Sequence, residues 1–520
     1  MMRADRRFAQ MLAGVVLIGG VQACDFEVTN PGPIQDVTVN AESAFQSLVN
    51  GAIRAFGDGL GEIYVGDGIV HGHMPSGHTG TAGTEPEEEV SLLNAERDGS
   101  NGGWSDLHRA RWIAEEAVRR IDAVVADPDN YPLKAQAHFW AGMASRTLGE
   151  NMCTAVFDGG DALPKSAYFD DPVHGAINHF NRAETIALAT GQANLATAAV
   201  GARAAANLFL GNGALARADA QTVPFAFKYT TAYTGFSGDP NYYLWEGVES
   251  LAFQSISMWG TPGHTHFLMT GDSRVAWGYD NGSKEIPAGQ TYAVRGQTHP
   301  SRPSWNALVP MYYPIKGYAP RKLTDFRELQ IFEPNIANQR LIQVNLVTGR
   351  EMELILAEAD LMDGIMGSAM THINNVRTST PVYAADLSTV MDLTLHPREA
   401  EDAVEADMPV YFTGTPGDFS GGGNLAAVSA SNIDEAWAAL KFERYLELSL
   451  EMRRFGDRWR WRDNNTPGAL DPLEYLDAKL TAKYGVPADA LNLCFPMTRG
   501  ENDANDNIAE DYKDWVTVGT

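Results

Sequence analysis

Cysteine, long apolar runs and catalytic motifs are all scarce in this chain of 520 residues, which contains only three cysteines. No stretch beyond the first 23 residues is apolar over the roughly 20 positions that a membrane-spanning helix needs. The chain contains no Cys-x-x-Cys pair, His-Glu-x-x-His motif, Ser nucleophile elbow or phosphate-binding loop. We therefore predict a protein that is not an enzyme and that carries no cofactor.

Basic residues are also in the minority, with 39 Lys and Arg against 66 Asp and Glu, so the formal net charge is −27. An acidic surface repels nucleic acid and anionic lipid headgroups, which excludes both as favoured partners. Hydrophobic residues make up 44% of the chain and charged residues 20%, as in ordinary globular proteins.

The N-terminus has the pattern of a targeting segment. Arg3, Arg6 and Arg7 precede an apolar run of about 11 residues, which is too short to span a bilayer, and Val21-Gln22-Ala23-Cys24 follows. Small residues before a cysteine resemble the lipobox of bacterial lipoproteins, in which Cys24 becomes the lipidated N-terminus. We predict removal of residues 1–23, which leaves a net charge of −29. The alternative is an ordinary secretory signal that happens to precede a cysteine.

The other two cysteines, Cys153 and Cys494, would then lie in an oxidising compartment. They could pair, or they could remain as buried thiols. Sequence does not distinguish these arrangements, and we slightly favour buried, unpaired cysteines.

The fold class predicted from periodicity is mainly α, with hairpins of tetratricopeptide type and irregular, loop-rich insertions. Small and apolar residues recur at helical spacing, and Gly191-Gln192 and Gly211-Asn212 have the composition of turns between helices. The predicted helices are 41–56, 104–126, 133–148, 174–189, 195–210, 347–361, 368–377 and 433 to about 461. After the signal peptide, one domain would comprise a helical part (24–222), a loop-rich insertion (223–340) and a C-terminal helical part (341–520).

The loop-rich insertion is the predicted ligand-binding region because it combines aromatic and polar residues. Flat aromatic faces stack on the C–H surface of sugars, while neighbouring polar groups bond the hydroxyls. The predicted ligand contacts are Trp259, Trp277 and Trp305, with Arg274 as a polar partner. The alternative is that these aromatics fill the core beneath the loops.

Two groups of residues raise the possibility of a metal site, and we predict none. Histidines at 71, 73, 78, 264 and 266 are too loosely spaced for a zinc motif. The segment 502–506 alternates oxygen-bearing side chains but lacks a complete calcium-loop pattern.

Carboxylates recur near the C-terminus at Glu443, Glu447 and Glu451, followed by Arg454 and Asp457. If one helix carried them all, i+4 and i+3 spacing would place them on one face. A pair of catalytic carboxylates is conceivable there, but we favour a structural helix terminus with ion pairs.

Four segments, in order, resemble the SusD/RagB family of outer-membrane nutrient-binding lipoproteins. They are Phe26 to Gly32 with the helix around Leu48 to Ala52; Arg350 to Ala359 with Asn374 to Arg377; Glu443 to Trp461; and Cys494 to Met497 with Asn505 to Ile508. Two positions depart from the family pattern, because Met452 stands where Gly is frequent and Arg458 where Leu is frequent.

The resemblance implies a protein of the cell surface, attached to the outer membrane by its N-terminal lipid. Such a protein binds an oligosaccharide or a peptide and delivers it to a SusC-like TonB-dependent transporter. Two other function classes remain open. Helical hairpins also form protein-interaction scaffolds, and a glycoside hydrolase needs only two suitably spaced carboxyl groups.

Overall fold

The computed structural model describes residues 41–70, 98–231, 262–275, 277–280, 311–314, 344–384, 416–449, 451–467 and 494–508. The chain divides into two compact units, Met1–Phe45 and Gln46–Thr520. In the first unit, the described residues form a short 3-10 helix, η1 (Glu42–Ala44). No helix in the described ranges is long and apolar enough to cross a membrane.

Helices dominate the second unit, as predicted. The helices are α3 (Phe45–Val70, which begins at the last residue of the first unit), α5 (Asp98–Val124), η2 (Pro128–Asn130), α6 (Pro132–Asn151), α7 (Ala167–Asp170), α8 (Ala176–Ala189), α9 (Ala193–Phe209), α10 (Gly213–Ala220), α11 (Pro262–Thr270), η4 (Ser273–Val275), α13 (Gly349–Met362), α14 (Met366–Thr378), α15 (Ile433–Glu447), α16 (Arg454–Asp463) and α18 (Arg499–Ala504). The strands are β1 (Thr154–Ala155), β2 (Leu163–Pro164), β3 (Lys228–Thr230), β4 (Trp277–Asp280), β5 (Met311–Pro314) and β6 (Asn345–Thr348).

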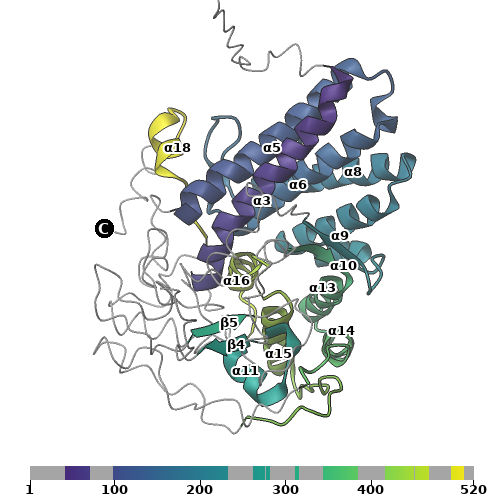
Figure 1. The fold of residues 1–520 in the computed structure, drawn as a ribbon, viewed down its shortest axis with the longest axis vertical. Coiled ribbons are helices and arrows are strands. Elements are labelled where there is room, and N and C mark those ends of the chain that lie inside the picture. The colour runs from purple at the N-terminus through teal and green to yellow at the C-terminus, as the bar shows by residue number, and fades with distance from the viewer. Residues whose placement is uncertain are drawn as a thin grey trace, which may run out of the picture. The chain divides into compact units, whose positions relative to one another are not determined.

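Successive helices pack against one another in a row. Helix α5 contacts α6, α6 contacts α8, and α8, α9 and α10 follow, after which α13 and α14 continue the row (Figure 1). The turns repeat one motif at Gly191, Gly211 and Gly364, each of which has a positive φ. At the first of them, Gln192 N–H donates to the Ala187 carbonyl at 2.7 Å and closes a Schellman motif. The predicted hairpins with glycine turns are therefore confirmed.

Glycine and alanine allow these helices to approach closely. A Cβ atom at Gly142 of α6 would lie 2.7 Å from the Phe180 ring of α8, and one at Gly59 of α3 would lie 2.8 Å from Leu107 of α5. Contacts this short exclude any side chain at the two glycines. The small residues seen in the sequence thus have a packing role.

Strands β3 and β6 bring together the two ends of the long segment that lies between Thr231 and Val344 in the sequence. They pair antiparallel, and Thr231 N–H donates to the Val344 carbonyl at 2.9 Å. Between them lie α11 and the pair β4 and β5, in which Trp277 is opposite Pro314. These elements fall within the segment 223–340 that was predicted to be irregular.

The predicted helix from Ile433 to about Trp461 is wrong as a single element. Helix α15 ends at Glu447 and α16 begins at Arg454. Between them, the buried Met452 has a φ of +55°, a left-handed conformation that favours glycine. Glu451 and Arg454 therefore do not share one face of a continuous helix with Glu443 and Glu447, which both belong to α15.

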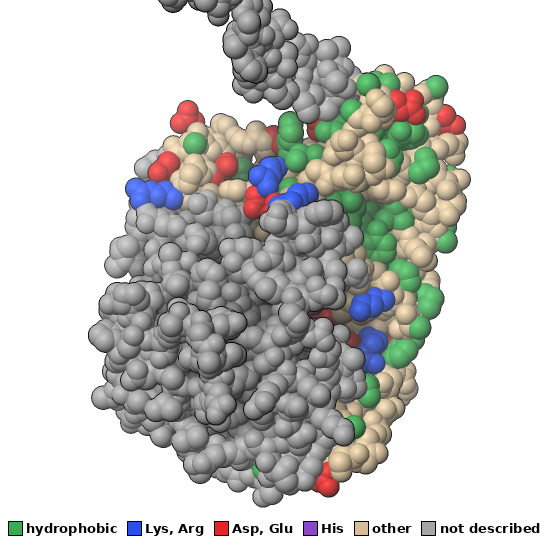
Figure 2. All heavy atoms as spheres, in the orientation of Figure 1, with side chains coloured by type: hydrophobic (Ala, Val, Ile, Leu, Met, Phe, Trp, Pro, Cys, Tyr) green, Lys and Arg blue, Asp and Glu red, His purple; other side chains and the backbone are tan. Residues whose placement is uncertain are grey.

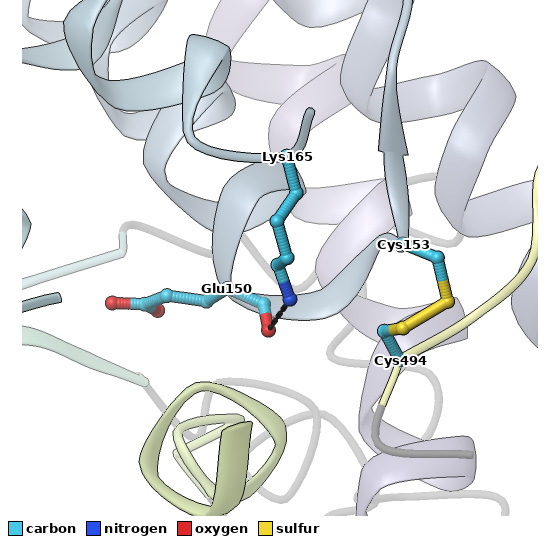
Figure 3. Close-up of a disulfide and its surroundings, with 4 residues drawn as sticks. All are labelled: Glu150, Cys153, Lys165 and Cys494. Carbon is cyan, nitrogen blue, oxygen red and sulfur yellow. Dashed lines mark hydrogen bonds between the residues drawn. A yellow bond between two sulfur atoms is a disulfide. The ribbon is translucent and has the colours of Figure 1, made fainter. Parts of the chain in front are cut away.

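Cys153 and Cys494 form a disulfide although they are 341 residues apart, so the slight preference for unpaired thiols is wrong. Figure 3 shows the bond between the chain that leaves α6 and the segment that leads to α18. Backbone hydrogen bonds reinforce the junction, because Phe495 N–H donates to the Asn151 carbonyl at 2.7 Å and Cys153 N–H to the Phe495 carbonyl at 2.9 Å. The C-terminal segment is thereby attached to the helical row.

Lys165 lies near this junction (Figure 3), and its Nζ is 3.5 Å from the Glu150 carbonyl oxygen. The ammonium group also lies 4.3 Å from the centroid of the Trp459 ring. Burial lowers the pKa of Lys165 to about 7. The aromatic ring and the carbonyl thus replace only part of the solvation that water would provide.

Charged side chains on the described part of the face drawn in Figure 2 occur in several separate groups. Acidic and basic groups alternate with hydrophobic and neutral atoms there. The excess of carboxylates in the composition therefore does not produce one continuous acidic patch on the described part of this face.

Candidate functional site

The aromatic residues predicted to contact a ligand are placed only in part. Trp259 and Trp305 lie outside the described residues, as do Cys24 and the histidines at 71, 73 and 78. The backbone of Trp277 belongs to β4, whereas its side chain lies outside the described part. The ligand-binding role of the three tryptophans stays a prediction.

Arg274 is buried, with 8% of its surface exposed, between the nearby carboxylate of Asp272 and two carboxylates from α15. Its Nη2 donates to Asp272 Oδ2 at 2.7 Å, and its Nη1 donates to Glu443 Oε1 at 2.5 Å and to Glu447 Oε2 at 3.1 Å. Burial opposes the ionisation of Asp272, but hydrogen bonds from His266 and Arg274 lower its pKa. These contacts give Arg274 a structural role, while its contact with ligand stays a prediction.

The same contacts show how the C-terminal carboxylates Glu443 and Glu447 are paired. Glu443 also accepts a hydrogen bond from Arg377, and Glu447 accepts two from Arg350 at 2.7 Å each. Both glutamates are buried, and each accepts hydrogen bonds from two arginines that belong to other elements. The predicted ion pairs are confirmed for Glu443 and Glu447, while the absence of a catalytic role stays a prediction.

A cavity of about 470 Å³ lies where α5 meets the loop after β1 and the C-terminal segment. Helix α5 presents one face to it, because Trp104, His108, Arg111 and Trp112 follow at i, i+4, i+7 and i+8. The buried Trp104 ring packs against His108 in a tilted arrangement, with ring centroids 4.5 Å apart. Trp112 is exposed over 56% of its surface, which is unusual for a tryptophan on a packed helix. This cavity is hereafter called the α5 pocket.

The wall opposite α5 comes from residues more than 340 positions further along the chain. Thr498 and Glu501 line the α5 pocket, and the Thr498 hydroxyl accepts from Glu501 N–H as the N-cap of α18. Asn505 and Asn507 donate from their amide groups to the carbonyls of Gly160 and Gly159, at 2.9 and 2.8 Å. The Cys153–Cys494 disulfide precedes this wall, so three separate connections place it.

Charged groups lie at the side of the α5 pocket next to the helical row. Arg111 is 2% exposed, and it donates to Glu115 Oε2 at 2.7 Å and to Asp158 Oδ1 at 3.2 Å. Asp158 is by contrast 56% exposed at its side chain. His108 is partly buried, and burial lowers its pKa to about 3, so it is neutral at physiological pH. The α5 pocket therefore combines aromatic faces, a neutral imidazole and an accessible carboxylate.

No protein-family model matches the chain, and no curated protein matches it. Solved structures do match. A SusD/RagB family protein from Bacteroides thetaiotaomicron superposes with a TM-score of 0.56 and 10% identity, over 91% of this chain and 96% of that one. A SusD-like carbohydrate binding protein from Bacteroides vulgatus gives 0.55 and 12%, over 90% and 97%. A SusD superfamily protein from the same species gives 0.53 and 12%, over 90% and 98%.

The chain has a SusD-like fold. The family resemblance inferred from four short segments is thus confirmed at the level of fold. One of those segments, Arg350 to Ala359 with Asn374 to Arg377, lies in the helix pair α13 and α14, and another forms the junction at the disulfide.

Reasoning from sequence missed the α5 pocket of this SusD-like fold. It placed Trp104 and Trp112 in a packed helix and searched for ligand contacts only in the segment 223–340. One usable signal was present, because Trp104, His108 and Trp112 recur every four residues beside Arg111. No pattern linked this helix face to residues 498–501.

Metal sites receive no support in the part of the chain that the structure describes, where no group of three or more His, Cys, Asp or Glu side chains could hold an ion. His266 is instead hydrogen-bonded to Asp272 at 3.1 Å. In the segment once considered for calcium, residues up to Ala504 belong to α18 and Asn505 supports the wall of the α5 pocket.

Proposed function

We propose that this chain is a cell-surface lipoprotein that binds an oligosaccharide nutrient and delivers it, unaltered, to a TonB-dependent outer-membrane transporter. The lipobox-like segment at Cys24 and the SusD-like fold support the class. The carbohydrate-binding description of one structural neighbour supports a saccharide rather than a peptide. The observation that carries the proposal is the α5 pocket, with an exposed tryptophan beside an exposed carboxylate.

The chemistry of the α5 pocket suits a sugar. Its volume, about 470 Å³, lies in the usual range for small-molecule sites. The exposed face of Trp112 can stack on the C–H surface of a pyranose ring, while the carboxylates of Asp158 and Glu501 can accept hydrogen bonds from its hydroxyls. In this proposal the loop aromatics Trp259, Trp277 and Trp305 form a second contact region for a longer chain.

Binding can be tested with residues 25–520 on an array of glycans and peptides, followed by calorimetry on each hit and analysis of products after long incubation. We expect binding without cleavage. Trp112→Ala should weaken the best glycan about tenfold, because it removes a stacking surface worth about 1.4 kcal/mol. Phe225→Ala, which removes an exposed aromatic ring that does not line the α5 pocket, is the matched control and should leave affinity unchanged.

The other outcomes separate the alternatives. Loss of affinity only in a Trp259, Trp277 and Trp305 triple alanine variant would move the site into the loop-rich insertion. Cleaved products would establish a glycoside hydrolase, and peptide hits alone would replace the saccharide. A folded protein that binds neither glycan nor peptide would favour the protein-interaction scaffold.

The anchor and the transporter need a separate test in cells. Cys24→Ala should move the protein from the outer-membrane fraction to the soluble fraction, because acyl chains supply roughly 0.8 kcal/mol of membrane affinity per buried CH₂ group. The wild-type protein, solubilised in detergent, should co-purify with an outer-membrane barrel. A Cys24→Ala variant that stays in the membrane would contradict lipid anchoring.

A further inference from the structure

Asp158 occupies an unusual position at the edge of the α5 pocket. Its φ is +53°, in the left-handed region that costs a non-glycine residue about 1 kcal/mol, and Gly159 follows with a φ of +72°. The carboxylate nevertheless stays largely exposed and lines the cavity. Aspartate is one of the few non-glycine residues that adopt this conformation readily, so the turn can present a carboxylate at the edge of the α5 pocket.

Two basic side chains lie beside this carboxylate. Arg111 Nη2 donates to Asp158 Oδ1 at 3.2 Å, and His174 Nε2 lies 3.6 Å from Asp158 Oδ2. The preceding residue, Phe157, stacks on the His174 ring at 4.9 Å between centroids, and the Arg111 guanidinium lies 5.1 Å from the Phe157 ring centroid. The backbone and the carboxylate of the loop are thus both placed by Arg111 and His174.

Glu115, one helical turn after Arg111 on α5, bonds both Arg111 and His174. Its Oε2 accepts from Arg111 Nη1 at 2.7 Å, and its Oε1 accepts from His174 Nδ1 at 3.1 Å. His174 Nδ1 is also 3.0 Å from Arg111 Nη1, but a protonated ring can donate only to the carboxylate. Burial opposes the ionisation of Glu115, but hydrogen bonds from His174 and His179 lower its pKa. Glu115 is therefore ionised, and its carboxylate holds Arg111 and His174 in place.

The opposite side of Glu115 is closed by two further imidazoles. His179 Nε2 donates to Glu115 Oε1 at 3.2 Å, and its Nδ1 shares a hydrogen bond with His138 Nδ1 at 3.1 Å. His138 Nε2 has no hydrogen-bond partner among the described residues, which fits a neutral ring, and burial lowers the pKa of His138. Glu115 Oε1 is thus held by His179 as well as by His174.

We propose that Asp158 is a specificity-determining residue of the α5 pocket, an acceptor for ligand hydroxyl groups, and that Glu115 is the positioning residue that places it through Arg111 and His174. This inference rests on the proposed function, because it assigns roles within the same site. Glu115 itself touches no ligand in this arrangement. A ligand without paired hydroxyls leaves the Asp158 carboxylate without a donor and binds less well.

The arrangement makes binding depend on pH. The hydrogen bond to Glu115 raises the pKa of His174 despite burial, so the ring is protonated below that raised pKa and loses its charge as pH increases through it. Loss of the charge removes one of the two cations that place Asp158, so affinity falls on the alkaline side. The charged and titratable groups packed around His174 are Arg111, Glu115, Asp158, His179, His138 and Asp171.

The test compares Asp158→Asn, Glu115→Gln and the control Asp161→Asn, which removes the same charge from an exposed position in the same loop. Affinity for the best glycan of the array is measured by calorimetry from pH 5 to 9. Asp158→Asn should weaken binding at least about tenfold, the loss of one hydrogen bond to a charged acceptor. Glu115→Gln should also weaken binding and should move the alkaline fall in affinity to lower pH, whereas Asp161→Asn should match the wild type.

A purely structural Glu115 would lower stability and would leave the pH profile in place, so the pH profile and the NMR titration of the His174 C2 proton are the deciding readouts. If Glu115→Gln does not fold, His174→Gln serves instead and should remove the pH dependence. Wild-type affinity in Asp158→Asn, or an unchanged profile in the folded Glu115 or His174 variant, would overturn the inference while the proposed function stands. Failure of the wild type to bind any glycan would overturn the proposed function itself.

Discussion

Glu358→Ala is expected to lower the free energy of unfolding by about 3 to 5 kcal/mol, because it leaves the buried guanidinium groups of Arg460 and Arg444 to share one counterion, Asp457, among the described residues. Glu358 is 1% exposed in α13, and both of its carboxylate oxygens accept from Arg460, at 2.7 and 2.8 Å. It also accepts from Trp461 Nε1 at 3.1 Å. Urea unfolding of residues 25–520, followed by circular dichroism, measures the change.

Glu353→Ala is the matched control for this prediction, since it removes the same side chain from the same helix. Glu353 is partly exposed and bonds to His372 and Asn375, at 2.8 and 2.9 Å. Its loss should cost about 1 kcal/mol or less. Equal decreases in the free energy of unfolding of the two variants would show that the buried ion pairs stabilise the fold no more than the partly exposed contacts do.

The second large effect is expected from the double replacement Cys153→Ala and Cys494→Ala. The disulfide closes a loop of 341 residues, and its removal should lower the free energy of unfolding by about 2 to 4 kcal/mol. The C-terminal wall of the α5 pocket should lose order at the same time, so glycan affinity should fall. Unfolding and calorimetry of residues 25–520 measure both effects.

A simple control uses the unaltered protein. Residues 25–520 contain no cysteine besides these two, so wild-type protein in dithiothreitol should unfold at the same urea concentration as the double variant. Added reductant should not affect the double variant. An unchanged unfolding midpoint in the double variant would mean that hydrogen bonds such as Phe495 N–H to Asn151 keep the segment in place without the disulfide.

Local patterns in the sequence predicted much of the fold. Helical spacing of small and apolar residues located α6, α8, α9, α13 and α14 to within about three residues, because such spacing reflects a buried face that each helix carries by itself. It ended the first helix at residue 56, whereas α3 continues to Val70, and it did not predict α7, α10 or α11. The turns at Gly191 and Gly211 were likewise recognisable, since a left-handed C-terminal residue selects glycine. The same local reasoning failed at Met452, where the chain is left-handed without glycine and one expected helix becomes two.

The candidate site could not be predicted in the same way. The α5 pocket joins a helix face, a loop at Asp158 and a wall near Glu501, and no periodicity links positions so far apart. Arg274 shows the same difficulty, because its partner Glu443 lies 169 residues away and converts an apparent surface arginine into a buried one. Only the packed structure assigns these side chains to their neighbours.

The sequence by itself therefore determined the helical class, the positions of five helices and the family resemblance, all of which depend on short-range spacing and composition. Tertiary structure alone decided the pairing of Cys153 with Cys494, the break between α15 and α16, and the assembly of the α5 pocket. The physical reason is that a residue's local conformational preference acts over a few positions, whereas a disulfide, a buried ion pair or a cavity depends on segments that meet only when the core packs.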